Sequence, residues 1–335
     1  MCRIAFVGDV MLGRLVSRQL ERRPPEYFWG DVGPLLRSCD AVVANLECAI
    51  THHAQQWLET HKTFHFRADP AAIDVLKIGN IRAVSLANNH ALDFEVEGLV
   101  ETIRLLEDAG IAHAGAGADE AAARCPAFFT AGPLKLALFA CVDHEEPFAA
   151  GPARPGTAYV DPGASGAASF PGTDAIAQTR KQGADLVLLS THFGPNMVLH
   201  PSHAIQSFRR VAVEAGIDII HGHSAHVFQG VELYKRSLIL HDTGDILDDY
   251  AIDPRLHNDW SFVFIVEAGA KGITKLRLVP VFLEFAHVRL ASELEAQPMF
   301  ARMIELSSAF GTHFSPGSTG RSLEMTVTDF STGGT

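Results

Sequence analysis

The chain has 335 residues, of which 47% are hydrophobic and 20% are charged. This composition supports a large buried core, and the length fits either two domains or one large α/β domain. The formal net charge is −12 and no cluster of Lys and Arg appears, which argues against a nucleic-acid-binding protein. An acidic total does not exclude an anionic substrate, because bound metal ions supply local positive charge.

The cysteines and the apolar segments bear on the compartment. The five cysteines are scattered without metal-ligand spacing, which is typical of thiols in a reducing cytosol. The chain opens on an apolar strand that Asp9 interrupts, rather than on a basic region followed by a long apolar one. No stretch approaches the roughly 18 apolar residues that span a bilayer. We therefore expect a cytoplasmic protein with no membrane partner.

Apolar runs alternate with helical patterns along the first part of the chain. The expected strands are residues 3–10, 40–46, 82–87, 134–142, 185–191 and 218–221, and the expected helices are 32–37, 71–78, 96–109, 174–182 and 202–215. The later part is β-rich, with strands at 227–234, 237–241, 261–267 and 274–285, followed by a helix within 293–311. The alternation predicts an α/β domain.

Two segments stand apart from this pattern. Residues 143–172 are rich in Gly, Pro and Ala, and we interpret them as an active-site lid or a substrate-binding insertion rather than a plain variable loop. We expect one domain over residues 1–292, followed by a C-terminal helix and a loose tail at 293–335.

Polar residues that suit divalent metals follow most of the expected strands. They are Gly8-Asp9-Val10, Asn45-Leu46-Glu47, Asn88-Asn89-His90 with Asp93, His192-Phe193-Gly194, His221 to His226, and His241-Asp242 with Gly244-Asp245. In open α/β sheets, ligands bind outside the carboxyl ends of the strands. Any one of these residues is also common as a helix cap, a turn residue or a hydrogen-bonded histidine. Their shared placement predicts a metal cluster built from carboxylate, imidazole and amide ligands.

The same motifs carry a family resemblance. They are Gly8-Asp9-Val10-Met11-Leu12-Gly13-Arg14, Asn45-Leu46-Glu47, Ala87-Asn88-Asn89-His90-Ala91-Leu92-Asp93, Thr191-His192-Phe193-Gly194 and Gly222-His223-Ser224-Ala225-His226. In this order they resemble the CapA family of capsule or poly-gamma-glutamate synthesis proteins, within the calcineurin-like metallophosphoesterase superfamily. The resemblance covers residues 3 to about 250 and implies a four-layer αββα sandwich, with a metal site at the sheet ends.

The resemblance also implies roles for individual residues. Asp9 would bind one metal, Glu47 would replace a bridging aspartate, and Asn89 would bind the second metal through its amide oxygen. The further implied ligands are His192, His223 and His226. His90 would be an uncoordinated general acid or base that Asp93 orients.

Three positions depart from the pattern of this resemblance. Met11 stands where the superfamily has a histidine ligand, Pro195-Asn196 follow the His-aromatic-Gly motif where a glutamate is frequent, and Gly244-Asp245-Ile246 replaces Gly-Asn-Phe. We therefore expect one or two divalent ions per chain. Imidazole with carboxylate suits Mn, Zn, Fe, Co or Ni alike.

Three cations are candidates for substrate binding. Residues 62–67 alternate polar and apolar side chains, so they form either an edge strand or a segment whose Lys62 or Arg67 clamps a carboxylate or phosphate. Arg14, at the end of the first motif, is the third candidate.

Three functions fit these residues. The leading hypothesis is metal-assisted hydrolysis of an amide or phosphoester in a peptide-like or gamma-glutamyl substrate, with His90 transferring the proton. The second is epimerisation at a peptide Cα in a ribosomal peptide, with His90 and another site histidine as two bases. The third is a non-catalytic component of envelope polymer synthesis.

Overall fold

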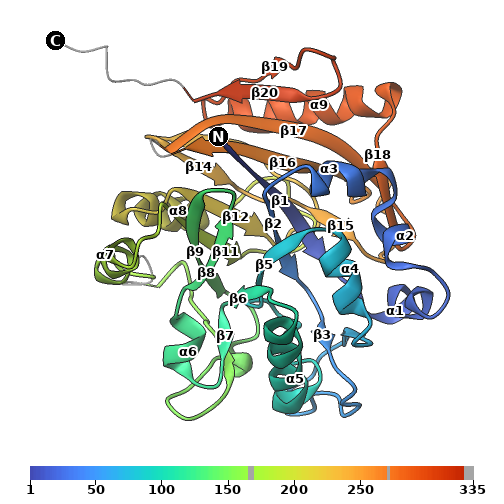
Figure 1. Cartoon of the computed structure of the whole chain (residues 1–335), viewed down its shortest axis with the longest axis vertical. Coiled ribbons are helices and arrows are strands. Elements are labelled where there is room, and N and C mark those ends of the chain that lie inside the picture. Colours follow the sequence, from blue (N-terminus) through green and yellow to red (C-terminus); the bar gives the residue numbers. More distant parts are fainter. Residues whose placement is uncertain (165–169, 270–271, 328–335) are drawn as a thin grey trace.

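Two β-sheets form the centre of the structure, a computed structural model that describes residues 1–164, 170–269 and 272–327 (Figure 1). The first sheet has the strand order β19-β20-β17-β16-β1-β2-β5-β6, with β15 beside β1 and β18 beside β17. Its strands are β1 (Cys2–Val10), β2 (Ala41–Leu46), β5 (Ile81–Ser85), β6 (Ala112–Ala114), β15 (Asp245–Leu247), β16 (Trp260–Gly269), β17 (Gly272–Glu284), β18 (His287–Leu290), β19 (Ser315–Pro316) and β20 (Leu323–Thr326). Strands β15, β1, β2, β5 and β6 run parallel, whereas β16 and β17 are antiparallel.

The second sheet has the order β13-β14-β12-β11-β9-β8. Its strands are β8 (Ala127–Ala131), β9 (Leu134–Val142), β11 (Leu186–His192), β12 (Ile219–His223), β13 (Val231–Tyr234) and β14 (Ser237–Leu240). The central four, β9, β11, β12 and β14, are parallel. Two short pairs lie outside both sheets: β3 (Ala49–Ile50) with β4 (Arg67–Ala68), and β7 (Ala116–Gly117) with β10 (Gly156–Thr157).

Helices cover the outer face of each sheet, as Figure 1 shows. Beside the first sheet lie α1 (Arg14–Leu20), α2 (Pro25–Trp29), η1 (Gly30–Val32), α3 (Gly33–Arg37), α4 (Ala72–Ile78) and α5 (Glu95–Asp108). Beside the second lie α6 (Glu120–Arg124), α7 (Thr173–Lys181) and α8 (His203–Ala215), whereas Phe148 of η2 (Glu146–Phe148) belongs to the core under the helices of the first sheet. The last helix, α9 (Glu293–Ser308), packs against β13, the edge strand of the second sheet, and against β17 of the first sheet.

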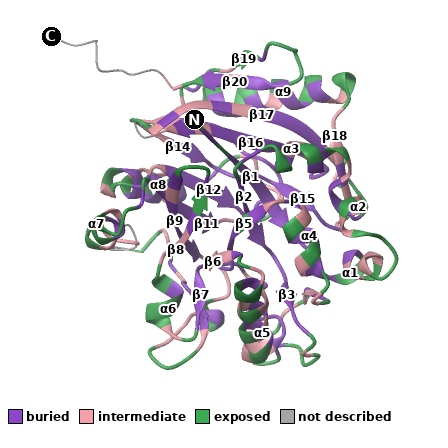
Figure 2. Cartoon of the chain, in the orientation of Figure 1, coloured by how far each residue is buried: buried purple, intermediate pink, exposed green. Residues whose placement is uncertain are grey.

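The strand sequences explain the layers, because successive side chains of a strand point to opposite faces. Along β1, Ile4 and Phe6 belong to the core between the two sheets, while Ala5 and Val7 belong to the core under the helices. Each fully buried large side chain, such as Phe6, contributes roughly 2–3 kcal/mol. Figure 2 shows the result, with buried strands at the centre and exposed outer faces on the helices.

The expected four-layer αββα sandwich is thus confirmed. The C-terminal part contributes to the core and to the first sheet, beyond the expected helix and tail, since α9 packs on the core and β20 pairs with β17. The domain boundary at residue 292 stays a prediction. The expected looseness of the last few residues, and residues 165–169 of the expected lid, lie outside the described residues. Among the described helices, none is long and apolar enough to cross a membrane.

Candidate metal and catalytic site

The carboxyl ends of the parallel strands of both sheets meet at one edge of the sandwich. Strands β1 and β12 contact each other across the two sheets, and His221 Nε2 lies 3.0 Å from the carbonyl oxygen of Val7. The residues that follow β1 and β2 therefore face those that follow β11 and β12. This arrangement brings together side chains that are far apart in the sequence, as strand-end placement predicts.

Two glycines allow the strands to approach closely enough. A Cβ on Gly8 would lie 1.7 Å from the carbonyl oxygen of Gly244, where the Asp9 amide donates a 2.9 Å hydrogen bond to the same oxygen. A Cβ on Gly222 would lie 2.0 Å from the carbonyl oxygen of His241. Only glycine fits at either place, because any side chain would push the backbones apart.

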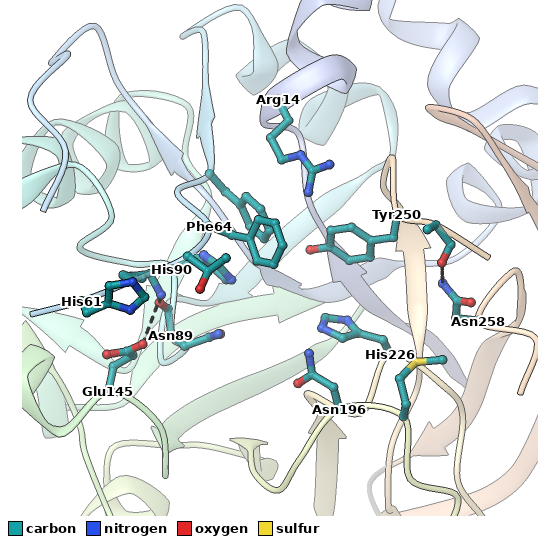
Figure 3. Close-up of a pocket in the computed structure, with 15 residues that line it drawn as sticks. Arg14, His61, Phe64, Asn89, His90, Glu145, Asn196, His226, Tyr250 and Asn258 are labelled. Carbon is teal, nitrogen blue, oxygen red and sulfur yellow. Dashed lines mark hydrogen bonds and ion pairs between the residues drawn. The ribbon is translucent and has the colours of Figure 1, made fainter. Parts of the chain in front are cut away.

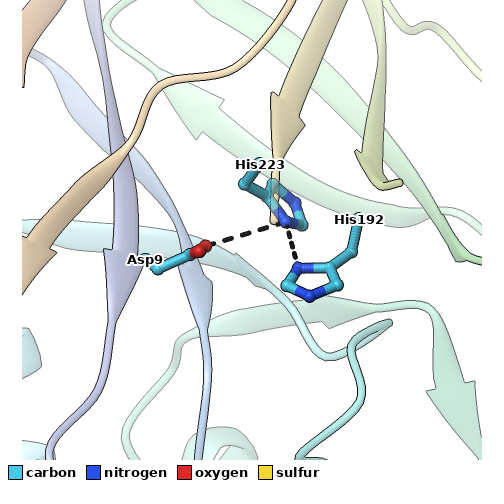
Figure 4. A group of neighbouring side chains, drawn as sticks. All are labelled: Asp9, His192 and His223. Carbon is cyan, nitrogen blue, oxygen red and sulfur yellow. Dashed lines mark hydrogen bonds and ion pairs between the residues drawn. The ribbon is translucent and has the colours of Figure 1, made fainter. Parts of the chain in front are cut away.

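The first ligand group consists of Asp9, His192 and His223 (Figure 4). The Nδ1 atoms of His192 and His223 lie 2.8 Å apart, and His223 Nδ1 lies 3.8 Å from Asp9 Oδ1. Asn45 Nδ2 donates to Asp9 Oδ1 at 2.8 Å, and Ser190 Oγ lies 2.7 Å from His223 Nε2. All these side chains are buried, so their neighbours hold them in one orientation.

The second ligand group consists of Asp9, Glu47, His226 and Asp245. His226 Nδ1 lies 2.8 Å from Asp245 Oδ1 and 3.6 Å from Asp9 Oδ2, while its Nε2 lies 4.0 Å from Glu47 Oε1. The Tyr250 hydroxyl donates to Glu47 Oε2 at 3.1 Å. Asp9 belongs to both groups, whereas Glu47 belongs to the second group alone, and the bridging role expected for Glu47 stays a prediction.

The donor set fits a cation. Asp9 Oδ2, Glu47 Oε1 and Asp245 Oδ2 are buried and have no hydrogen-bond partner among the described residues. Burial and the charge of Asp245 raise the pKa of Asp9 well above its usual range, and burial and the charge of Asp9 raise the pKa of Glu47 to about 8. Because unpaired buried carboxylates are costly, these groups either take up protons or are neutralised by a cation bound beside them.

The histidines of the two groups differ in their electrostatic surroundings. Burial lowers the pKa of His192 and of His223 well below the usual range, which favours neutral rings with a lone pair free to bind metal. Burial also disfavours the charged form of His226, but the carboxylates of Glu47 and Asp9 outweigh it, so its pKa is raised.

The loop after β12 holds His226 in an unusual backbone conformation. His226 has φ 58° and Ser224 has φ 117°, a region that non-glycine residues rarely adopt. Ser224 Oγ donates to the carbonyl oxygen of Gly194 at 2.8 Å, and the Ala225 amide donates to Asp242 Oδ2 at 2.9 Å. Such strained conformations cluster at functional sites, where surrounding contacts enforce them.

His90 and Asp93 form a hydrogen-bonded pair beside the second ligand group. His90 Nδ1 lies 2.6 Å from Asp93 Oδ2, which also accepts a 2.6 Å hydrogen bond from the Phe66 amide. The imidazole stacks on the Phe66 ring at a centroid distance of 3.8 Å. Its Nε2 lies 3.9 Å from Glu47 Oε1. His90 is therefore oriented with Nε2 toward the ligand cluster, as a proton-transfer group requires.

A cavity of about 520 Å³ opens above this cluster (Figure 3). It is lined by Arg14, His61, Lys62, Thr63, Phe64, Phe66, Asn89, His90, Glu145, Asn196, Met197, His226, Tyr250, Ala251 and Asn258. Arg14 points into the cavity; its Nε lies 3.3 Å from Asp249 Oδ1 and its guanidinium lies 5.6 Å from the ring centres of Phe64 and Phe66. The volume suits a small molecule or a few residues of a peptide.

Of the three cations expected to bind substrate, two line the cavity and one does not. Arg14 and Lys62 line the cavity, but Lys62 Nζ already lies 3.3 Å from Asp93 Oδ1 and 3.4 Å from Glu145 Oε1. Arg67 does not line the cavity; its Nη1 donates to the carbonyl oxygen of His53 at 3.0 Å. The expected edge strand at residues 62–67 is also wrong, because only residues 67–68 pair, as β4.

Asn89 is the remaining expected ligand. It lines the cavity, and its Oδ1 is buried without a hydrogen-bond partner among the described residues. The neighbouring Asn88 is structural instead, since its Nδ2 donates to Asn45 Oδ1 at 3.0 Å and to the carbonyl oxygen of Leu46 at 2.8 Å. An amide oxygen without a donor is a suitable further ligand beside the carboxylates.

Sequence reasoning did not assign roles to several residues at the site. Asp245 had been noted among the polar strand-end residues and as a departure from a motif, but not as an individual ligand, and Tyr250, which donates to Glu47, had not been noted. Asp143 and His144 follow β9 at the same edge, where the His144 ring lies 5.8 Å from that of His192. The strand-end rule applies to Asp143 and His144 as well, and would have found them.

Two strand-end histidines are structural. Besides Val7, His221 Nε2 lies 3.1 Å from Thr243 Oγ1. His241 Nε2 lies 3.1 Å from Glu232 Oε2, and its ring stacks on Phe310 at 4.3 Å. Both have satisfied polar atoms, so neither is needed to bind a ligand.

The structure therefore defines an αββα sandwich protein with a carboxylate- and histidine-rich candidate metal centre at the ends of its strands. The sequence matches the family described as bacterial capsule synthesis protein PGA_cap over residues 3–250, and the chain belongs to this family. The family resemblance expected from the motifs is confirmed.

Relatives with assigned names share just over a quarter of their residues with this chain. A probable polyglutamine synthesis accessory protein of Mycobacterium tuberculosis is 28% identical over 84% of this chain and 77% of its own length. The capsule biosynthesis protein CapA of Bacillus anthracis is 27% identical, over 73% of this chain and 59% of its own. The PGA biosynthesis protein CapA of Bacillus subtilis is 28% identical, over 73% and 63%.

Solved structures show more distant likeness. The NAD nucleotidase NadN of Haemophilus influenzae has a TM-score of 0.47 and 13% identity, covering 88% of this chain and 52% of that one. The sulfate thiohydrolase SoxB of Thermus thermophilus has a TM-score of 0.45 and 11% identity, covering 94% and 61%. Scores this low support no inference about activity.

Proposed function

We propose that this protein is a metal-dependent hydrolase that cleaves an amide or phosphoester bond in a peptide-like or gamma-glutamyl substrate. The observation that carries the proposal is the convergence of unpaired buried carboxylate oxygens and imidazoles beside an oriented histidine, His90, which lines a cavity together with the candidate ligand His226. Membership of a capsule synthesis family, and relatives named for polyglutamine or PGA synthesis, support a glutamyl chain as the substrate class.

Each group at the site has a chemical role in this proposal. A divalent ion bound by the two ligand groups supplies Lewis-acid polarisation of the carbonyl or phosphoryl oxygen. His90 Nε2 moves the proton to or from the reacting group, and Asp93 holds Nδ1 so that Nε2 faces the cavity. Lys62 orients Asp93 and the Asn89 backbone rather than binding substrate. Arg14 binds a substrate carboxylate.

Turnover of a substrate panel tests the proposal. Purified protein is loaded with Mn²⁺ or Zn²⁺ and offered gamma-glutamyl peptides, alpha-linked glutamyl peptides and phosphodiesters in water enriched in heavy oxygen. Hydrolysis places one heavy oxygen atom in one of the two products, which mass spectrometry detects. The variants Asp9→Ala and His223→Ala should lose both metal and turnover, while Glu21→Gln, at an exposed position, should keep both. No cleavage of any substrate by the metal-loaded protein would contradict hydrolysis.

A specific feature favours epimerisation as a second candidate function. The Nε2 atoms of His90 and His226 lie 3.9 Å and 4.0 Å from the same oxygen, Glu47 Oε1, and each Nδ1 lies beside a carboxylate. His90 and His226 both line the cavity, and two imidazoles there suit removal and return of a Cα proton in a peptide, with His226 acting as a base instead of a metal ligand. A divalent ion would stabilise the enolate-like charge by binding a terminal carboxylate.

Heavy water distinguishes the two reactions. Epimerisation leaves the peptide intact and introduces one deuterium at a Cα, whereas hydrolysis cleaves the chain. If the metal-loaded protein gives neither result, and Asp9→Ala binds partner polymer or protein as well as the wild type does, the non-catalytic role in envelope polymer synthesis becomes the better explanation.

A further inference from the structure

Asp242 is a buried carboxylate that belongs to neither ligand group. It follows β14 and is 1% exposed. Its Oδ2 accepts a 2.9 Å hydrogen bond from the Ala225 amide, and its Oδ1 accepts a 2.8 Å hydrogen bond from the Gly244 amide. One side chain therefore joins two backbone segments, the loop after β12 and the turn into β15.

Both of these segments present candidate ligands. The loop after β12 presents His226, which has φ 58°, and the turn presents Asp245 directly after Gly244, which has φ 66°. The carbonyl oxygen of Gly244 also accepts a 2.9 Å hydrogen bond from the Asp9 amide. Strained backbone conformations such as that of His226 persist only where surrounding contacts enforce them. The two hydrogen bonds that Asp242 accepts are contacts of this kind.

A buried arginine extends the connection to β11. Arg209 of α8 is 1% exposed, and its Nη1 donates a 2.7 Å hydrogen bond to the carbonyl oxygen of His241. Its Nε and Nη2 donate to Thr191 Oγ1 at 3.2 Å and 2.9 Å. His241 directly precedes Asp242, and Thr191 directly precedes His192. The guanidinium therefore links the segment of Asp242 to the strand end that presents His192.

The two loops need both oxygens of the Asp242 carboxylate. Burial raises the pKa of Asp242 to about 6 and no further, because the two amide hydrogen bonds and the charges of Arg209 and His226 favour the ionised form. Asp242 is therefore a carboxylate at neutral pH. An asparagine side chain accepts through one oxygen and donates through its nitrogen, so it would turn an N–H group toward one of the two backbone amides.

We propose that Asp242 and Arg209 position the candidate metal ligands from outside the ligand groups. Asp242 fixes the backbones that present His226 and Asp245, and Arg209 ties these backbones to the strand end that presents His192. Neither Asp242 nor Arg209 lines the cavity, so both are positioning residues. The inference rests on the metal centre of the proposed function, but it does not depend on which reaction the centre performs.

Asp248 acts on one of the same ligands in a different way. Its carboxyl group interacts with that of Asp245, and its Oδ1 accepts a 2.8 Å hydrogen bond from the Tyr250 amide. Asp248 thus restrains the side chain of Asp245, whereas Asp242 restrains the backbone before it. Substitution of Asp242 keeps the other two carboxyl groups, so its effect on metal binding reports the backbone restraint.

Metal affinity of the folded variants tests the inference without measuring activity. Metal-free protein is titrated with Zn²⁺ against a chromogenic chelator, and the visible absorption of Co²⁺-loaded protein reports the geometry of the ligands. Asp242→Asn should bind Zn²⁺ about 10- to 100-fold more weakly and change the Co²⁺ spectrum, since partners that orient ligands affect metal affinity by that much. Arg209→Lys keeps the buried charge but loses the forked donor geometry, so it should weaken Zn²⁺ binding as well.

Asp218→Asn is the matched control. Asp218 Oδ2 also accepts a backbone hydrogen bond, from the Val187 amide at 2.6 Å, and also pairs with an arginine of a helix, Arg180 of α7. Asp218 directly precedes β12, however, and so lies at the opposite end of this strand from His223. Asp218→Asn should therefore keep the wild-type Zn²⁺ affinity and Co²⁺ spectrum.

Circular dichroism checks the folding of every variant. A folded Asp242→Asn protein with the wild-type Zn²⁺ affinity and Co²⁺ spectrum would overturn the inference, because Asp242 would then have a structural role only. If Asp242→Asn does not fold, unchanged Zn²⁺ affinity in Arg209→Lys would overturn it. Weakened binding in these variants, with a wild type that cleaves no substrate, would refute the proposed reaction but support this inference. A wild type that binds no divalent ion would refute both.

Discussion

Replacing Glu47 by glutamine should stabilise the metal-free protein and weaken the metal-bound one. Glu47 is fully buried, and burial together with the neighbouring Asp9 raises its pKa from 4.5 to about 8. Glutamine has nearly the same shape and still accepts the hydrogen bond that Tyr250 donates to Oε2. The substitution therefore removes a poorly compensated charge and little else.

The size and the sign follow from proton linkage. Because the folded state holds the Glu47 proton more tightly, its contribution to stability is complete below about pH 4.5 and is lost as the pH rises to about 8. A shift of this size corresponds to at most about 5 kcal/mol, at roughly 1.4 kcal/mol per pH unit. The buried amide also loses hydration, so we expect a gain of about 3 kcal/mol. For 335 residues this corresponds to an increase in Tm of about 4 °C.

Thermal unfolding of chelator-treated protein, followed by circular dichroism, measures this effect. The Tm of Glu47→Gln should exceed that of the wild type at about pH 8.5, and the difference should shrink toward about pH 5. With saturating Mn²⁺ the order should reverse, because the wild type keeps a ligand that the variant lacks. Glu21→Gln, which is exposed, should show no difference under any condition. A Glu47→Gln protein no more stable than the wild type without metal at high pH would refute the reasoning.

Two further predictions concern proton transfer and strand approach. Asp93→Asn removes the carboxylate that lies 2.6 Å from His90 Nδ1, so turnover should fall by roughly 100- to 10,000-fold while the metal content stays unchanged. If the variant turns over substrate as fast as the wild type, the His90–Asp93 pair takes no part in the reaction. Gly8→Ala places a Cβ 1.7 Å from the Gly244 carbonyl oxygen and should lower the Tm by more than about 5 °C. The control Gly269→Ala has open space around the added Cβ and should change the Tm by less than about 2 °C. Equal changes in Tm for the two variants would contradict the close approach of β1 to the Gly244 backbone.

Most of the fold was predictable because its information is local. The strand Leu134–Val142 was predicted with its observed ends, and the other long parallel strands and α4, α5, α7 and α8 within one or two residues, since buried strands and amphipathic helices carry strong periodic patterns. Short elements such as α6 and β15 were missed, because three to five residues carry too little periodicity. The wrong strand at residues 62–67 shows the converse, because a polar and apolar alternation occurs there in a segment that mostly lines a cavity and pairs in no sheet before residue 67.

The candidate site likewise contains residues that the sequence identified and residues whose place only the structure showed. By itself, the sequence determined that polar ligand types follow the strands, which identified Asp9, His192 and His223, because parallel strands end at one edge of a sheet. Only the tertiary structure decided that Arg67 lies away from the cavity and that Asp245 lies beside Asp9. The orientation of a side chain and the pairing of a three-residue strand depend on long-range packing, which no local pattern in the sequence records.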